Sequence, residues 1–115
     1  MAKEKSGYYG PRRKFWSWGY EGEEISQEEI NIMRVRVEQR LGIKDIKVLS
    51  DPTLDEIDLY SSRIQIPRTL EDFCTSEKWD RVSHTYGKSF KDMTLTYRRD
   101  FKKAPDVVAY PRDEE

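Results

Sequence analysis

The chain has 115 residues, of which 37% are charged and 36% hydrophobic, and its formal net charge is −1. This length allows one modest domain, and the balanced charge gives no support to nucleic-acid binding. The single Cys74 excludes an internal disulfide and fits a reducing, cytoplasmic compartment. No apolar run approaches the ~18 residues of a membrane span, and the N-terminal lysines lack the apolar stretch of a secretory signal.

Residues 1–24 are expected to form an arm, because glycines and Pro11 interrupt any regular period. Six aromatic residues are interleaved with three cations between positions 8 and 20. Such an arm can stack on single-stranded nucleic acid. More often its rings pack against a folded body while its cations stay in water. The near-neutral charge favours the second interpretation.

The next segment predicts a helix over residues 27–41. Ser26 and Glu29 have the spacing of a capping box, and Gly42 can take the left-handed conformation that ends a helix. The apolar residues follow at helical spacing: Ile30, Met33, Val37 and Leu41.

Residues 46–49 are expected to form a brief strand, and Asp51–Pro52 to turn the chain. Residues 53–60 fit either one helical turn or an extended segment. A short helix is expected near 70–74, where Thr69 and Asp72 repeat the capping spacing with a shorter acid.

Two further helices are expected. Thr75 or Ser76 caps the first, which ends at Gly87, and Ser89 opens the second. The apolar sets are Trp79, Val82 and Tyr86 for the first helix, and Phe90, Met93 and Tyr97 for the second.

The last predicted element is a strand over residues 107–110, apolar on both faces. A strand of this kind usually lies inside a sheet with both faces covered. No other clear strand in the sequence can cover it. We therefore expect a fold that is completed by strands beyond residue 115.

The sequence offers little chemistry. The only histidine, His84, cannot build a metal site alone and is expected to be structural or solvent-facing. Cys74 is expected to pack, because the neighbouring acids disfavour a thiolate. Gly87–Lys88–Ser89 is similar to the end of a phosphate-binding loop, but Val82 stands where that motif needs glycine. A helix–turn–helix joint is favoured, and an anion at the Ser89-capped helix start stays open.

Four blocks in order resemble a known family. They are Lys14–Tyr20 (KFWSWGY), Ser61–Ile64 (SSRI), Asp80–Ser89 (DRVSHTYGKS) and Pro105–Val108 (PDVV). They are similar to blocks of the type 4 FAD-linked oxidase group, and in particular of alkylglycerone-phosphate synthases. The first block matches at its lysine and at its last three residues and differs at 15–17.

The resemblance implies an α+β fold in which a mostly helical N-terminal segment ends in the first strand of a vanillyl-alcohol-oxidase-type FAD-binding domain. It divides the chain into an arm (1–24), a helical region (25–103) and the start of the FAD-binding domain (104–115). The flavin loop and the catalytic residues of the family lie further on, so FAD is expected only in the complete enzyme. The partner implied is the remainder of that flavoenzyme, and the chain alone is expected to be inactive.

The residues expected to contact an anion or the substrate side are Arg81, His84, Lys88 and Arg98. No catalytic, flavin-binding or metal-binding residue is assigned in this chain. Peripheral membrane contact through Trp16 and Trp18 stays open, and the sequence does not specify an oligomeric state. The alternative function is a small non-enzymatic interaction module that uses the aromatic and basic arm.

Overall fold

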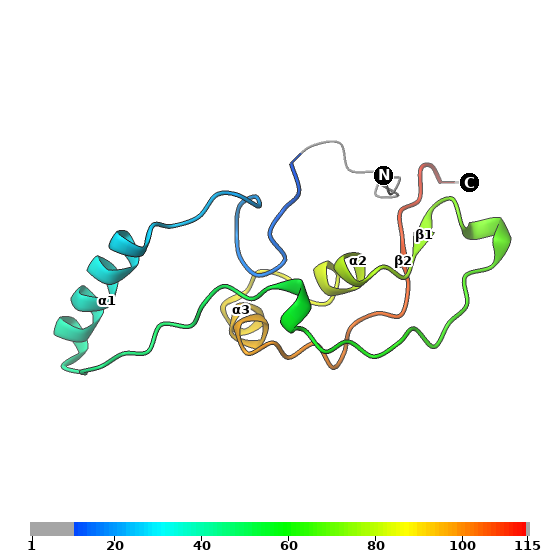
Figure 1. Ribbon diagram of the computed structural model, residues 1–115. Coiled ribbons are helices and arrows are strands. Elements are labelled where there is room, and N and C mark those ends of the chain that lie inside the picture. Colours follow the sequence, from blue (N-terminus) through cyan, green and yellow to red (C-terminus); the bar gives the residue numbers. More distant parts are fainter. Residues whose placement is uncertain (1–10, 115) are drawn as a thin grey trace.

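A computed structural model describes residues 11–114, so the first two aromatic residues of the arm lie outside the described residues. The elements are α1 (Gln27–Leu41), η1 (Leu54–Glu56), η2 (Arg68–Leu70), β1 (Cys74–Thr75), α2 (Lys78–Ser83), α3 (Phe90–Tyr97) and β2 (Val108–Ala109). Helices and a small two-stranded antiparallel sheet are both present (Figure 1). This confirms the general α+β class.

Helix α1 confirms the predicted bounds and both predicted caps. The Glu29 N–H donates to Ser26 Oγ at 3.2 Å, and the Ser26 N–H donates to the Glu29 carboxylate at 3.1 Å. Gly42 ends the helix with φ 63°, which costs a glycine little because it has no Cβ. Local residues therefore fix where α1 begins and ends.

Replacing Ser26 by alanine is expected to destabilise α1 by about 1 kcal/mol, because the Glu29 N–H loses the Ser26 hydroxyl oxygen that accepts its hydrogen bond. Hydrogen exchange of the α1 amides measures this local change. Ser26→Asp keeps an acceptor at the cap and should retain most of the protection. Equal loss in both variants would contradict a capping role for the hydroxyl.

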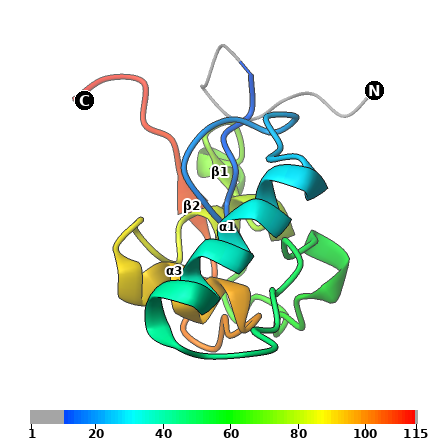
Figure 2. The same ribbon diagram turned by 90° about the vertical axis from the view of Figure 1, so that its left-hand side faces the viewer.

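Helix α1 projects from the rest of the molecule. It contains no buried residue, and it occupies one end of a molecule that measures 58 × 28 × 28 Å (Figure 1). Figure 2 shows α1 from that end, in front of the other elements. The radius of gyration is 17.7 Å, against roughly 13 Å for a compact domain of this length.

The strand predicted at 46–49 is wrong. The segment that leaves α1 is extended but pairs with no strand in the described part of the chain, and Val48 and Leu49 are about half exposed. The Ile46 N–H instead donates to the Glu38 carboxylate at 3.0 Å. A side chain of α1 thus holds the start of this segment, which then runs from α1 toward η1 (Figure 1).

The sheet joins β1 and β2, with Cys74 opposite Ala109 and Thr75 opposite Val108. The helix predicted near 70–74 is therefore wrong: η2 and a turn precede β1, whose pairing with a distant segment overrides the local capping signal. The expectation that no strand of this chain pairs with residues 107–110 is also wrong, since β1 covers one edge. Val108 is 6% exposed, whereas Ala109 on the other face is exposed.

The core lies between the arm, α2 and the segment after α3. Its four buried apolar residues are Phe15, Ile57, Val82 and Phe101. Trp79 and Tyr86 pack against them, as predicted from the helical spacing. However, α2 ends at Ser83, so Tyr86 and Gly87 lie beyond the helix, and its N-cap is Glu77 without a side-chain hydrogen bond.

Helix α3 begins after Ser89, whose Oγ accepts from the Asp92 N–H at 3.2 Å, as predicted. Its predicted apolar face is wrong at Phe90, which is 84% exposed. The buried side chain of α3 is Thr96. None of the helices in residues 11–114 combines the length and apolar character that a membrane crossing requires.

Candidate functional site

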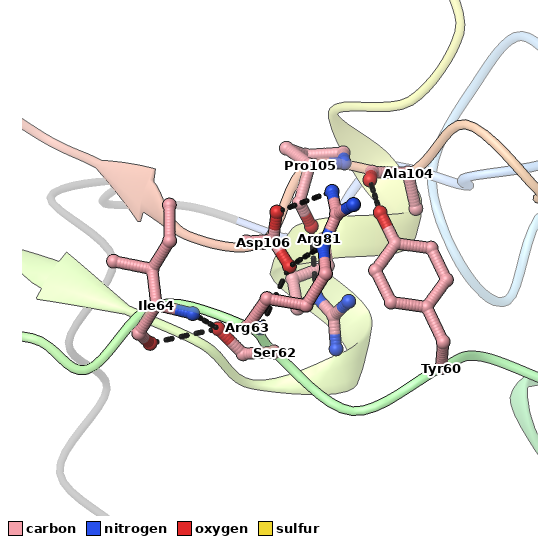
Figure 3. A network of polar contacts seen from close by, with 8 residues as sticks. All are labelled: Tyr60, Ser62, Arg63, Ile64, Arg81, Ala104, Pro105 and Asp106. Atoms are coloured by element: carbon pink, nitrogen blue, oxygen red, sulfur yellow. Dashed lines mark hydrogen bonds and ion pairs between the residues drawn. The ribbon is translucent and has the colours of Figure 1, made fainter.

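The most connected polar site lies where residues 60–64 meet α2 and the segment before β2 (Figure 3). Arg63 binds Asp106 three times: Nη2 to Oδ2 at 2.8 Å, Nε to Oδ1 at 3.2 Å and the backbone N–H to Oδ1 at 2.9 Å. The guanidinium side chain is 74% exposed and the carboxylate side chain 11%. This forked geometry fixes the chain just before β2.

Arg81 forms the inner half of the site. It projects from α2, is 4% exposed, and its Nε donates to the Pro105 carbonyl oxygen at 2.8 Å. The guanidinium carbons of Arg81 and Arg63 lie 5.0 and 5.2 Å from the centre of the Tyr60 ring, within cation–π range. The Tyr60 hydroxyl donates to the Ala104 carbonyl oxygen. Three successive residues, 104–106, are thus held by side chains.

Asp106 is paired with Arg63 and also feels the charge of Arg81. The hydrogen bond from the Arg63 side chain contributes most to lowering the pKa of Asp106. The positive charge of Arg81 lowers this pKa further. Nη2 of Arg81 is buried and has no hydrogen-bond partner among the described residues. A desolvated donor without a partner costs free energy, so this atom is suited to an acceptor from outside residues 11–114.

Two ion-paired carboxylates, Asp106 in this site and Glu56 outside it, should make the stability of the protein depend on pH. Ion pairing lowers the pKa of Asp106 below 3.8 and that of Glu56, which binds Arg99, below 4.5. A carboxylate whose pKa is lower in the folded state than in the unfolded state stabilises the fold. This stabilisation is complete above the unfolded-state pKa and is lost as the pH falls through the folded-state pKa. We therefore expect the free energy of unfolding to fall between neutral pH and about pH 3, as urea titrations would measure.

Asp106→Asn should reduce that acid dependence, because it removes one of the titrating groups. Asp58→Asn is the control, since this exposed carboxylate makes no hydrogen bond within the described residues. An unchanged pH profile in the Asp106 variant would contradict the assignment.

Two open grooves border Tyr60. One, of about 510 Å³, is lined mostly by polar and charged side chains that include Asp55, Asp58, Lys78 and Arg81. The other, of about 540 Å³, is lined by Tyr60, Ser61, Arg63, Lys102, Lys103 and Ala104. A flavin ring needs a largely apolar pocket with few polar groups. These grooves do not fit FAD, and no step of flavin chemistry is assigned to this chain.

His84, a predicted contact residue, lies beyond the end of α2. Its Nδ1 is 2.7 Å from the Asp80 carbonyl oxygen, which can only accept, so Nδ1 carries the proton. The ring meets Tyr110 edge-on at 5.4 Å, and the Tyr110 hydroxyl donates to the Asp80 carboxylate at 2.5 Å. Burial, followed by this hydrogen bond, raises the pKa of Tyr110. These contacts hold Tyr110, the residue that follows β2. His84 itself is exposed, which confirms the prediction that it is structural or solvent-facing.

The four predicted contact residues do not assemble into one site. Lys88 Nζ donates to the Lys14 carbonyl oxygen at 3.1 Å and so ties the arm to the turn between α2 and α3. Burial lowers the pKa of Lys88. Arg98 is exposed at the end of α3, and no contact joins it to Arg81 or His84. Only Arg81 belongs to the cluster around Tyr60.

Cys74 and the turn at Gly87–Ser89 lie in structural positions. Cys74 is buried in β1, which confirms that it packs, although the predicted helix there is wrong. Gly87–Lys88–Ser89 lies between α2 and α3, as expected of a helix–turn–helix joint. Within residues 11–114 no group of three or more His, Cys, Asp or Glu could hold a metal ion.

One aromatic side chain of the arm packs against the body as expected, whereas another is exposed to solvent. Phe15 is 6% exposed and lies in the core, while Trp18 is 66% exposed. The Arg12 guanidinium carbon lies 4.2 Å from the centre of the Trp79 ring. The arm is therefore a docked part of the body in its described portion.

Sequence reasoning missed Tyr60, Arg63 and Asp106 as members of a site. Two of the blocks quoted for the family resemblance, Ser61–Ile64 and Pro105–Val108, meet in this cluster. Comparison of the chain with protein-family models, with curated proteins and with solved structures finds no match.

Proposed function

We propose that this chain is a non-catalytic N-terminal segment or subunit of an FAD-linked oxidase of the alkylglycerone-phosphate synthase type. Its role is to pack against the FAD-binding domain, and β2 is the first strand of that domain's sheet. FAD, bound by the later domain, supplies the chemistry of the family, and this chain supplies support. The order of the four sequence blocks suggests the family.

The observation that carries the proposal is the open edge of β2. The Tyr110 N–H donates to the Phe73 carbonyl oxygen at 2.7 Å, and the register places Cys74 opposite Ala109. In an antiparallel ladder, hydrogen-bonded and non-hydrogen-bonded pairs alternate, so the Ala109 N–H and C=O point away from β1. Neither group is hydrogen-bonded within the described residues. An open edge of this kind accepts another strand.

The polar cluster supports the same role, because it fixes the approach to that edge. Arg63, Arg81 and Tyr60 hold residues 104–106 immediately before β2, and Asp80 holds Tyr110 immediately after it. A strand whose two ends are anchored by side chains is preorganised to pair, so less ordering entropy opposes its association. The unpartnered Arg81 Nη2 is a second point at which the incoming domain can contribute an acceptor.

The test is reconstitution. The polypeptide encoded in the frame after Glu115, or in the neighbouring frame, is produced with and without this chain. We expect a stable complex that retains the flavin absorbance during gel filtration, and weaker flavin retention without this chain. The absence of any flavoprotein in those frames, or a flavoprotein that elutes separately from this chain, would overturn the proposal and would favour the interaction module.

A further inference from the structure

We propose that the second groove beside Tyr60 binds the phosphate group of a phosphomonoester. This basic groove has a volume of about 540 Å³ and is lined by Tyr60, Ser61, Arg63, Lys102, Lys103 and Ala104. The inference goes beyond the proposed function and does not depend on it, because residues of this chain alone form the groove.

The basic groove holds positive charge that the protein does not balance. Three cations and no carboxylate line it. Asp106 balances Arg63 in an ion pair at 2.8 Å. Lys102 and Lys103 are exposed, and neither makes an ion pair with a residue that the structure describes. The nearby Asp100 carboxylate accepts from the backbone N–H of Lys102 at 3.3 Å. The two lysine charges are therefore left for an anion from outside residues 11–114.

A buried cation behind Tyr60 adds to this positive charge. Arg81 is 4% exposed, donates from Nε to the Pro105 carbonyl oxygen at 2.8 Å, and makes no ion pair in the described part of the chain. Its charge helps to lower the pKa of Asp106, so its field reaches the Arg63 end of the groove. A buried charge is screened less than an exposed one, so Arg81 strengthens the attraction for an anion.

The donors of the basic groove suit phosphate. Asp106 engages Nε and Nη2 of Arg63, and a guanidinium has five N–H donors, so donors remain for a second acceptor. Each lysine offers an ammonium group, and the Ser61 hydroxyl can donate as well. The Ala104 carbonyl oxygen, which would repel an anion, already accepts from the Tyr60 hydroxyl (Figure 3).

The charge of the ligand follows from the two unbalanced lysines. A phosphomonoester carries a charge of about −1.5 to −2 at neutral pH and three terminal acceptor oxygens, which matches two ammonium groups and the remaining N–H and O–H donors. A carboxylate carries a single charge and two oxygens, so it would satisfy fewer of these donors.

The neighbouring groove offers a comparison within the same molecule. It shares Tyr60 and Ser61 with the basic groove, but three carboxylates and two cations line it: Asp55, Glu56, Asp58, Lys78 and Arg81. The carboxylates repel an anion there, so we expect phosphate to bind in the basic groove.

Titration of the full 115-residue chain with inorganic phosphate at constant ionic strength, followed by ¹H–¹⁵N NMR, tests the site. We expect saturable shifts of the amides of residues 61–63 and 102–104. The double variant Lys102→Gln/Lys103→Gln should bind phosphate at least about tenfold more weakly. The matched control is Lys44→Gln/Lys47→Gln, which removes the same charge from two exposed lysines outside the groove and should keep the wild-type affinity.

Vesicles distinguish the source of the phosphate. Binding of inorganic phosphate without vesicle binding supports a soluble phosphomonoester. Binding to phosphatidylcholine vesicles that contain phosphatidic acid, lost in the Lys102/Lys103 variant, supports a lipid headgroup with the same phosphate chemistry. Equal binding to phosphatidylserine vesicles, equal weakening in the two double variants, or no saturation at millimolar phosphate would overturn the proposal. None of these outcomes bears on the edge of β2, so the proposed function is tested separately.

Discussion

Replacing Phe101 by alanine is expected to destabilise the protein by about 3–5 kcal/mol, the usual cost of emptying a phenylalanine site in a core. The side chain is 2% exposed. Its ring meets those of Tyr86 and Phe15 at 5.3 and 6.2 Å, so it joins the arm to the turn after α2. Because domains have a stability of only about 5–15 kcal/mol, this loss is a large share of the total free energy of unfolding. Urea unfolding followed by tryptophan fluorescence measures the change.

The matched control is Phe90→Ala. Phe90 is 84% exposed at the start of α3, so its removal empties no site and should change stability by less than about 0.5 kcal/mol. If the two variants lost similar stability, the core would lie elsewhere than around Phe15, Ile57 and Phe101. The two variants also compare the core seen in the structure with the core predicted from the sequence. Helical spacing alone predicts Phe90 as a core residue and gives no signal for Phe101.

The elements that the sequence predicts correctly are those with local causes. The bounds of α1 follow from Ser26, Glu29 and Gly42, which lie at its ends. The start of α3 follows from Ser89 in the same way. A cap is a hydrogen bond between residues a few positions apart, so its geometry is present in the sequence whatever the rest of the chain does.

The wrong predictions concern segments whose structure depends on residues far away in the sequence. Cys74 and Thr75 join a strand because β2, more than thirty residues later, supplies the ladder. Residues 46–49 have a strand-like composition, but in residues 11–114 no neighbour completes a ladder for them. The candidate site shows the same limit. Arg63 and Asp106 are 43 residues apart in sequence, and only the fold brings them within 2.8 Å.

The cluster around Tyr60 holds residues 104–106 before β2 through side-chain hydrogen bonds, and this anchoring links the site to the proposed assembly. A strand edge that is held in place can pair without first being ordered. If the open edge of β2 is the docking edge, the backbone of Ala109 matters more than its side chain. This makes a backbone substitution the sharpest test.

Ala109→Pro is expected to weaken binding of the flavin-domain polypeptide at least about tenfold, because proline removes the N–H that points to the open edge. The two-stranded sheet itself should persist, since Ala109 occupies a non-hydrogen-bonded pair with Cys74. Far-UV circular dichroism and urea unfolding of the isolated chain check the fold. Titration of the flavin-domain polypeptide, monitored by its flavin absorbance, measures the binding.

Val108→Pro is the contrasting variant. Val108 is buried, and its N–H points toward Thr75, so proline here removes a bond of the existing ladder and should destabilise the isolated chain. The proposal requires the two variants to differ: Ala109→Pro keeps the stability of the isolated chain and binds more weakly, while Val108→Pro loses stability. An Ala109→Pro chain that folds and binds with unchanged affinity would show that the partner domain docks elsewhere than on the edge of β2.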